Sequence, residues 1–107
     1  MSRAKLFLSA RTPFTGISAA FEKADYVFFG VPYDKTSTYR AGSRFAPGAI
    51  RDVSANLELY SIRSGIDLER VPVHDMGDVD VVEDLEETLQ RVKAVVTEII
   101  QAKKLPI

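Results

Sequence analysis

The chain contains no cysteine and only one histidine among its 107 residues. The lack of cysteine excludes a disulfide framework, a thiolate zinc site and a cysteine nucleophile. Its 14 basic and 15 acidic residues nearly cancel, which argues against a nucleic-acid surface or a groove for a polyanionic substrate. No segment is apolar enough for a signal peptide or a membrane span. These absences predict a soluble, cytoplasmic chain of at most one domain, without nucleic-acid or membrane partners.

Several familiar functional motifs are also missing. The sequence has no GxGxxG dinucleotide fingerprint. Residues 30–37, GVPYDKTS, place Lys35 and Thr36 as a phosphate-binding loop does, but no glycine directly precedes the lysine, so that motif fails. No serine lies in a nucleophile-elbow sequence. Nucleotide binding and serine-dependent hydrolysis therefore have no support from motifs.

The apolar pattern predicts strands and helices in alternation. Residues 26–31 are aromatic and β-branched without polar alternation, as in a strand covered on both faces, and Pro32 ends the run because it lacks an N–H. Apolar residues at helical spacing predict a helix over 47–60. A second strand is expected over 71–76, ended by Gly77.

The last helix is expected over residues 84–104. Asp84 can cap its first turn while Glu87 returns the bond. Its apolar face is predicted to contain five residues: Leu85, Leu89, Val92, Val96 and Ile99. Residues 105–107 then resume an apolar run, where a third strand should begin.

This order of elements predicts an α/β fold with right-handed crossovers and a parallel sheet. So few parallel strands would leave apolar edges and faces uncovered. We therefore expect residues 1–107 to be the N-terminal portion of a single, larger α/β domain.

A metal site at the end of the second strand is one hypothesis. His74 is followed directly by Asp75, with Asp78 and Asp80 close behind. A catalytic metal needs about three protein ligands in suitable geometry. The simpler interpretation, which we favour, is that the acids cap the turn after the strand while the histidine packs in or near the sheet.

The long charged loop after the first strand allows two interpretations. Arg40 and Arg44 could hold a carboxylate ligand through their planar guanidinium groups. They could instead brace the loop, paired with nearby acids or with loop carbonyls, and this structural role is the one we favour. The candidate acids are Asp34, Asp52 and Glu58.

Three further loop residues have simple structural explanations. Gly42 supplies a backbone conformation that other residues avoid. Tyr33 and Tyr39 could line the mouth of a pocket or cover the edge of the sheet.

Four segments together resemble the amino-terminal third of the arginase/agmatinase (ureohydrolase) family, most closely its agmatinases. They are GVPYD (30–34), STYRAGSRFAPGAIR (37–51), NLELYS (56–61) and VHDMGDVDV (73–81). The sequence departs from the family at Ala41, where proline is usual, and at Ala46, where glycine is usual. Neither change removes a reactive group.

The resemblance implies a three-layer α/β/α sandwich with a central parallel sheet. It also implies a cytoplasmic, homo-oligomeric (trimeric or hexameric) hydrolase that converts agmatine and water into putrescine and urea. Family members bind two Mn²⁺ ions per subunit, and a hydroxide between the ions attacks the guanidinium carbon. The loop over 32–45 is expected near the active-site rim and subunit contacts, and Asp75 and Asp78 are expected to be mainly structural.

The family's metal-ligand motifs, of GGDHS, DAHxD and SxDxDxxDP type, are absent from the 107 residues. We therefore assign no catalytic, substrate-binding or metal-binding residue here, and expect these 107 residues alone to be inactive, with the Mn²⁺ ligands beyond residue 107. Two alternatives remain: a ureohydrolase acting on another guanidino substrate, and a non-catalytic α/β module that folds against a partner chain.

Overall fold

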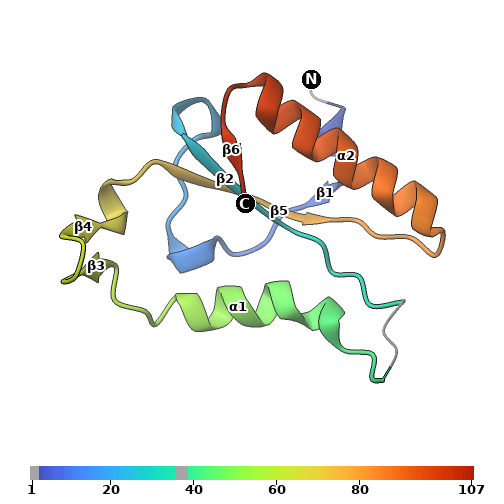
Figure 1. The fold of residues 1–107 in the computed structure, drawn as a ribbon, viewed down its shortest axis with the longest axis horizontal. Coiled ribbons are helices and arrows are strands. Elements are labelled where there is room, and N and C mark those ends of the chain that lie inside the picture. The colour runs from blue at the N-terminus through green and yellow to red at the C-terminus, as the bar shows by residue number, and fades with distance from the viewer. Residues whose placement is uncertain (1–2, 36–38) are drawn as a thin grey trace.

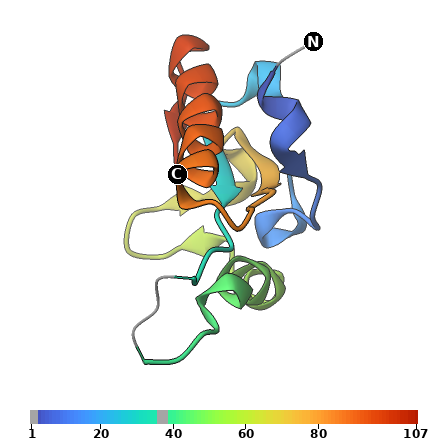
Figure 2. The same cartoon turned by 90° about the vertical axis from the view of Figure 1, so that its right-hand side faces the viewer.

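The computed structural model describes residues 3–35 and 39–107 and consists of a sheet between two helices (Figure 1). Helix α2 (Leu85–Gln101) covers one face of the sheet and α1 (Ala46–Ser54) lies on the other side, as Figure 2 shows from the end. Thr36 and Ser37, the end of the rejected phosphate-loop sequence, lie outside the described residues. The layering agrees with the predicted α/β fold class.

The main sheet has four strands in the order β1-β5-β2-β6. Strand β2 (Tyr26–Gly30) pairs in parallel with both β5 (Val73–Val79) and β6 (Leu105–Pro106). The strands predicted at 26–31 and after residue 104 are thereby confirmed. The predicted parallel sheet is confirmed for β2, β5 and β6. A further strand that was not predicted, β1 (Leu8–Ser9), pairs antiparallel with β5, Leu8 opposite Val79.

The amino-terminal segment shows no clear apolar period because it is built from short turns. Three 3₁₀ helices occupy it: η1 (Ala4–Phe7), η2 (Phe14–Gly16) and η3 (Phe21–Lys23). Each is too short to leave a helical period in the sequence.

The prediction that Gly77 ends the second strand is wrong, because β5 continues through it to Val79. The register between β2 and β5 shifts here, since Phe28 lies opposite Asp75 while Gly30 lies opposite Asp78. The extra residue in β5 makes a bulge, and Gly77 adopts a φ of +86° that glycine tolerates. A Cβ at this position would also overlap the carbonyl oxygen of Ser9.

The helix predicted over 47–60 is wrong at its end. Helix α1, entered through η4 (Ser43–Phe45), stops at Ser54. The Ser54 hydroxyl donates to the Arg51 carbonyl at 2.7 Å, a bond that competes with helix continuation. The chain then forms a separate hairpin of β3 (Tyr60–Ser61) and β4 (Ile66–Asp67), followed by η5 (Leu68–Arg70).

Helix α2 confirms the prediction over 84–104 to within three residues. Asp84 caps it by accepting from the Glu86 N–H at 3.0 Å. Glu87 does not return the bond to Asp84 but pairs with Arg91 one turn later, at 3.2 Å. The predicted apolar face is corrected at its beginning, because Leu85 and Leu89 are exposed.

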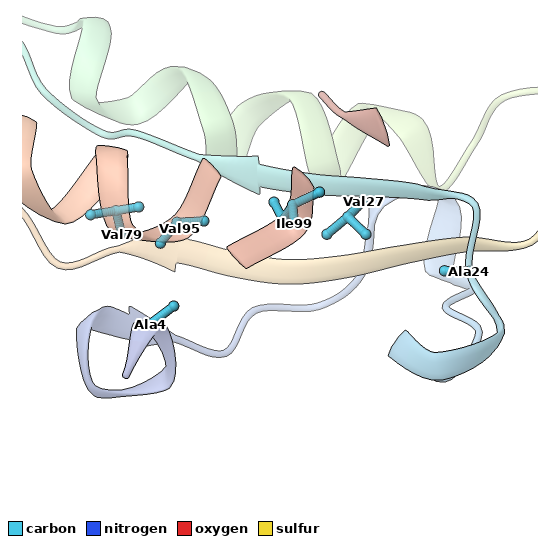
Figure 3. Close-up of a cluster of buried hydrophobic side chains, with 6 residues drawn as sticks. All are labelled: Ala4, Ala24, Val27, Val79, Val95 and Ile99. Atoms are coloured by element: carbon cyan, nitrogen blue, oxygen red, sulfur yellow. The ribbon is translucent and has the colours of Figure 1, made fainter. Parts of the chain in front are cut away.

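The core lies between the sheet and α2 (Figure 3). It consists of six fully buried apolar residues: Ala4, Ala24, Val27, Val79, Val95 and Ile99. Ala4 and Ala24 come from the amino-terminal segment, so that segment is part of the fold. Within the described residues, no helix has the length and apolar character needed to cross a membrane.

Candidate functional site

Two loops meet beyond the carboxyl ends of the adjacent parallel strands β2 and β5. Lys35, after β2, forms an ion pair with Glu83, after β5. The carboxyl ends of parallel strands are where α/β proteins place ligand-binding groups. This end of the sheet is therefore the candidate site, and the loop from β2 to α1 forms one of its walls.

Asp34 holds that loop in shape. Its carboxylate is 4% exposed and accepts from the N–H of Gly42 at 2.7 Å and the N–H of Arg44 at 3.3 Å. The Arg44 guanidinium lies 3.7 Å from the other carboxylate oxygen. One of the predicted partners of Arg44 is thus confirmed. Gly42 has the positive φ expected of it, at +154°.

The remaining loop residues differ in their surroundings. Arg44 also lies over the Phe45 ring at 4.8 Å, while Arg40 lies over the Tyr39 ring at 5.4 Å. Within the described part of the chain, Arg40 makes no ion pair with the predicted carboxylates. Tyr39 is 87% exposed, whereas Tyr33 is half-buried and lines the hollow beside Asp34.

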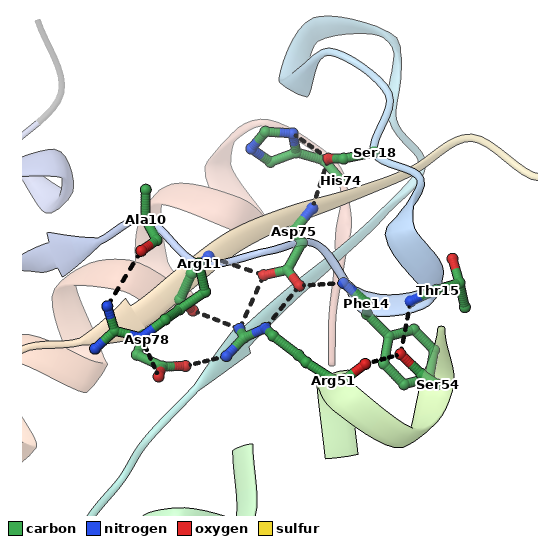
Figure 4. A network of polar contacts seen from close by, with 11 residues as sticks. Ala10, Arg11, Phe14, Thr15, Ser18, Arg51, Ser54, His74, Asp75 and Asp78 are labelled. Atoms are coloured by element: carbon green, nitrogen blue, oxygen red, sulfur yellow. Dashed lines mark hydrogen bonds and ion pairs between the residues drawn. The ribbon is translucent and has the colours of Figure 1, made fainter. Parts of the chain in front are cut away.

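A buried cluster of charges joins α1 to β5 (Figure 4). Arg51 Nε donates to Asp75 Oδ2 and Arg51 Nη2 donates to Asp75 Oδ1, both at 2.9 Å. Arg51 Nη1 donates to Asp78 Oδ1, and Nη2 also donates to the Gly77 carbonyl at 3.0 Å. Arg11 pairs with the other oxygen of Asp78 at 3.3 Å. Bidentate pairing fixes both the distance and the orientation of the guanidinium.

The same cluster ties the amino-terminal segment to the sheet. Asp75 Oδ2 accepts from the Phe14 N–H at 2.8 Å, and the Thr15 N–H donates to Ser54 Oγ at 2.7 Å. Asp75 Oδ1 accepts from the Gly77 N–H at 2.8 Å within the bulge. Three separate parts of the chain therefore depend on one carboxylate.

The electrostatics of the cluster follow from burial and pairing. Burial raises the pKa of Asp75, but the Arg51 hydrogen bonds, the Gly77 and Phe14 N–H groups and the Arg51 charge together lower this pKa below its ordinary value. Hydrogen bonding to Asp75 raises the pKa of Arg51 above its ordinary value, against the effect of its burial. Both groups are therefore held in their charged forms.

Arg51 is the central residue that the sequence analysis missed. A signal for it exists in the sequence, because Asp75 and Asp78 flank a glycine in a strand that must be buried. Two buried carboxylates require a counter-charge. Only the fold shows that Arg51, one turn after Pro47, supplies it.

The hypothesis of a metal site at His74, Asp75, Asp78 and Asp80 is not supported. His74 donates through Nδ1 to the Ala19 carbonyl, 2.8 Å away, and packs edge-on against Phe21. Asp80 accepts from Ser9 Oγ at 2.5 Å, apart from the Arg51 cluster. The histidine thus packs against the sheet as favoured. Asp75 and Asp78 bind Arg51, and Asp75 also accepts the Gly77 N–H inside the bulge. Across residues 3–35 and 39–107, no three histidines, cysteines or carboxylates gather as a metal would require.

Comparison with known proteins decides the family. The sequence profile of the arginase family matches residues 24–107, most of the chain. The chain belongs to the arginase family. The solved structure of agmatine ureohydrolase from Thermoplasma volcanium superposes with a TM-score of 0.84 at 38% identity, covering 92% of this chain and 33% of that one. The arginase-like α/β fold expected from the resemblance is confirmed.

Two relatives of the arginase family are similar in sequence over 89 residues each. N(1)-aminopropylagmatine ureohydrolase of Thermococcus kodakarensis is 40% identical, over 80% of this chain and 31% of the relative. Agmatinase of Bacillus anthracis is 37% identical, over 82% of this chain and 31% of the relative. The chain therefore spans about a third of the length of the relatives it matches.

The use of manganese in the arginase family is supported by a further structure. Trypanosoma cruzi formiminoglutamase with Mn²⁺ has a TM-score of 0.73 at 25% identity, covering 90% of this chain and 34% of that one. The residues described here do not fit such a centre, because Asp75 and Asp78 are neutralised by Arg51.

Proposed function

We propose that these 107 residues form the N-terminal part of a single ureohydrolase domain whose complete form hydrolyses a guanidino group to urea and an amine. The observation that carries this proposal is the similarity to the Thermoplasma volcanium agmatine ureohydrolase, in fold and in sequence, over 92% of the chain. The Bacillus anthracis agmatinase adds independent support at 37% identity.

Agmatine is the proposed substrate, giving putrescine and urea. A second candidate is N(1)-aminopropylagmatine, because the Thermococcus kodakarensis relative named for it is 40% identical. Both compounds carry the same guanidino group and differ in the amine attached to it.

The contribution of the described residues is to build and hold one wall of the site. The Arg51 cluster fixes α1 against β5, and Asp34 fixes the loop that leads into α1. Two Mn²⁺ ions per subunit are part of the proposal, with ligands supplied by residues outside the 107. No step of the reaction is assigned to a residue described here.

A homo-oligomer, a trimer or a hexamer, and a cytoplasmic location complete the proposal and stay predictions. The second function class is a non-catalytic α/β module that folds against a partner chain. The exposed apolar residues on α1 and the β3–β4 hairpin are compatible with it. The two classes differ in one property, which is urea release by a protein that includes the manganese-ligand motifs.

The test is direct. The coding sequence that follows Ile107 should encode a GGDHS-like run, and the protein expressed from it should release urea from agmatine with added Mn²⁺. N(1)-aminopropylagmatine and arginine serve as comparison substrates, and their kcat/KM values rank the candidates. A protein that contains the motif but releases urea from none of them would reject the ureohydrolase proposal in favour of the binding module.

A further inference from the structure

Residues 10–19, which we call the strap, run from β1 toward η3 along the edge of β5 that faces away from β2. Strand β1 pairs only with the last two residues of β5. Farther back along the same edge the strap takes over. The Ala19 N–H donates to the Val73 carbonyl at 2.8 Å, and the Asp75 N–H donates to Ser18 Oγ at 3.1 Å. The strap thus covers backbone groups that an open sheet edge would leave unpaired.

Two buried side chains hold the middle of the strap (Figure 4). Asp75 Oδ2 accepts from the Phe14 N–H at 2.8 Å, and Ser54 Oγ accepts from the Thr15 N–H at 2.7 Å. The Asp75 side chain is 2% exposed and Ser54 is 1% exposed. Water therefore has little access to either acceptor while the strap is in place, and losing a bond there is costly.

The backbone of the strap is strained at the point where it is held. Thr15 has a φ of +64°, and Gly16 follows it with a φ of +77°. Glycine tolerates this region, but for a β-branched residue such as threonine it is unfavourable. Such a conformation persists only where the surroundings impose it. The bonds to Asp75 and Ser54 impose it here, so strain at Thr15 opposes closure of the strap.

The buried core does not depend on the strap. None of its six fully buried apolar residues lies between positions 10 and 19. The Phe14 ring contacts the Phe28 ring, with 4.9 Å between the centroids, but Phe14 itself is only half-buried. Segments with few buried apolar contacts open at a lower free energy than the core does.

We propose that the strap is a conformational device that opens as one unit while the sheet and α2 stay folded. Opening breaks the bonds to Asp75 and Ser54 together, relieves the strain at Thr15 and uncovers the edge of β5. Asp75 and Ser54 also bond to Arg51 of α1. Closure of the strap and the position of α1 are therefore coupled, and each stabilises the other. This inference does not depend on the proposed ureohydrolase activity.

Amide hydrogen exchange of the folded chain, measured by NMR over a series of low urea concentrations, tests the proposal. The amides of Phe14, Thr15 and Ala19 should report one common opening with little dependence on urea. They should exchange at least about tenfold faster than those of Val95 and Ile99, which lie in the core. Exchange of the strap at the rate and urea dependence of α2 would show that it opens only when the whole chain unfolds. Unequal opening at Phe14 and Ala19 would show that it is not one unit. Either result would overturn the proposal.

Two substitutions should move the exchange of the strap in opposite directions. Ser54→Ala removes the acceptor of the Thr15 N–H and should speed exchange about fivefold. Thr15→Asn should slow it about twofold or more, because asparagine tolerates a positive φ. Thr15→Asn is also an independent test if Ser54→Ala unfolds the chain.

Ser61→Ala is the matched control. Ser61 Oγ accepts from the Ser64 N–H at 3.2 Å in the β3–β4 hairpin, and this bond persists when the strap opens. The control should therefore leave exchange of the strap unchanged. Equal effects of Ser54→Ala and Ser61→Ala, or faster exchange in Thr15→Asn, would contradict the roles assigned to Ser54 and Thr15.

Discussion

Arg51 of α1 binds Asp75 of β5 through two parallel hydrogen bonds, Nε to Oδ2 and Nη2 to Oδ1, each 2.9 Å long. Both side chains are nearly inaccessible to solvent, with 7% and 2% of their surfaces exposed. The pair joins one outer layer of the molecule to the sheet. It also explains why the buried residues of α1, Arg51 and Ser54, are polar.

Arg51→Met should destabilise the chain by about 3–5 kcal/mol, because it leaves Asp75 and Asp78 buried without their counter-charge. Arg51→Lys should fall between Met and the natural residue, since an ammonium cannot reproduce the bidentate pairing. Thermal and urea unfolding at one fixed protein concentration measure the effect. Arg63→Met, at an exposed arginine, is the control and should change stability little. Equal losses from the two Met variants would contradict the role of Arg51.

Acid should weaken the fold through Asp75. Its pKa is lowered in the folded state, so its ionised form adds stability at every pH above the ordinary carboxyl pKa of about 4. That stability is lost as the pH falls from about 4 through the lowered value. The melting temperature measured from pH 7 to pH 2 should therefore drop in acid, and Asp75→Asn should be less stable at pH 7 but lose less on acidification. An unchanged acid profile in Asp75→Asn would contradict the assignment.

Gly77→Ala should cost more stability than Gly65→Ala. Both glycines have positive φ, +86° and +71°, so an alanine is strained by roughly 1–2 kcal/mol at either position. Only at Gly77 would the new Cβ also overlap the Ser9 carbonyl, because β1 approaches closely there, whereas nothing lies within 4 Å at Gly65. Comparing the two melting temperatures isolates the effect of this contact. Equal shifts would show that β1 can move away without cost.

Loss of the Asp34 side chain from the loop before α1 should lower the stability of the fold more than loss of the Arg44 side chain. Asp34→Ala leaves two backbone N–H groups without their acceptor and should cost about 1–3 kcal/mol. Arg44 is 55% exposed, so Arg44→Ala should cost less than about 1 kcal/mol. In a longer, active protein, Arg44→Ala should lower thermal stability or assembly more than it raises KM for agmatine. A large rise in KM with an unchanged melting temperature would show that Arg44 contacts the substrate.

The periodicity of apolar residues predicts helices and strands well where those apolar residues are in fact buried. Residues 26–31 and 84–104 were predicted for this reason, and Val27 and Ile99 are indeed fully buried. The apolar period over 47–60 misled the prediction of α1, since it reflects an exposed surface rather than a core-facing side. Tyr60 belongs to a strand instead, paired with Asp67.

The Arg51 cluster could not be derived from local pattern because its members are 24 and 27 residues apart in the chain. A glycine between two acids predicts the end of a strand. Gly77 is nevertheless part of β5, because β1 approaches it closely and because β5 forms a bulge opposite Phe28 and Gly30. The role of Asp34 was within reach of the sequence, because a charged loop needs a buried acceptor for its backbone N–H groups.

The measurement that tests the central claim most directly is urea release from agmatine by the 107-residue chain across a series of Mn²⁺ concentrations. The claim is that these residues are one part of an arginase-family domain and hold none of its metal ligands. It predicts urea at the level of the no-protein control throughout, and no stoichiometric Mn²⁺ binding by calorimetry. Urea above that control, or tight binding of Mn²⁺ to the chain, would contradict it.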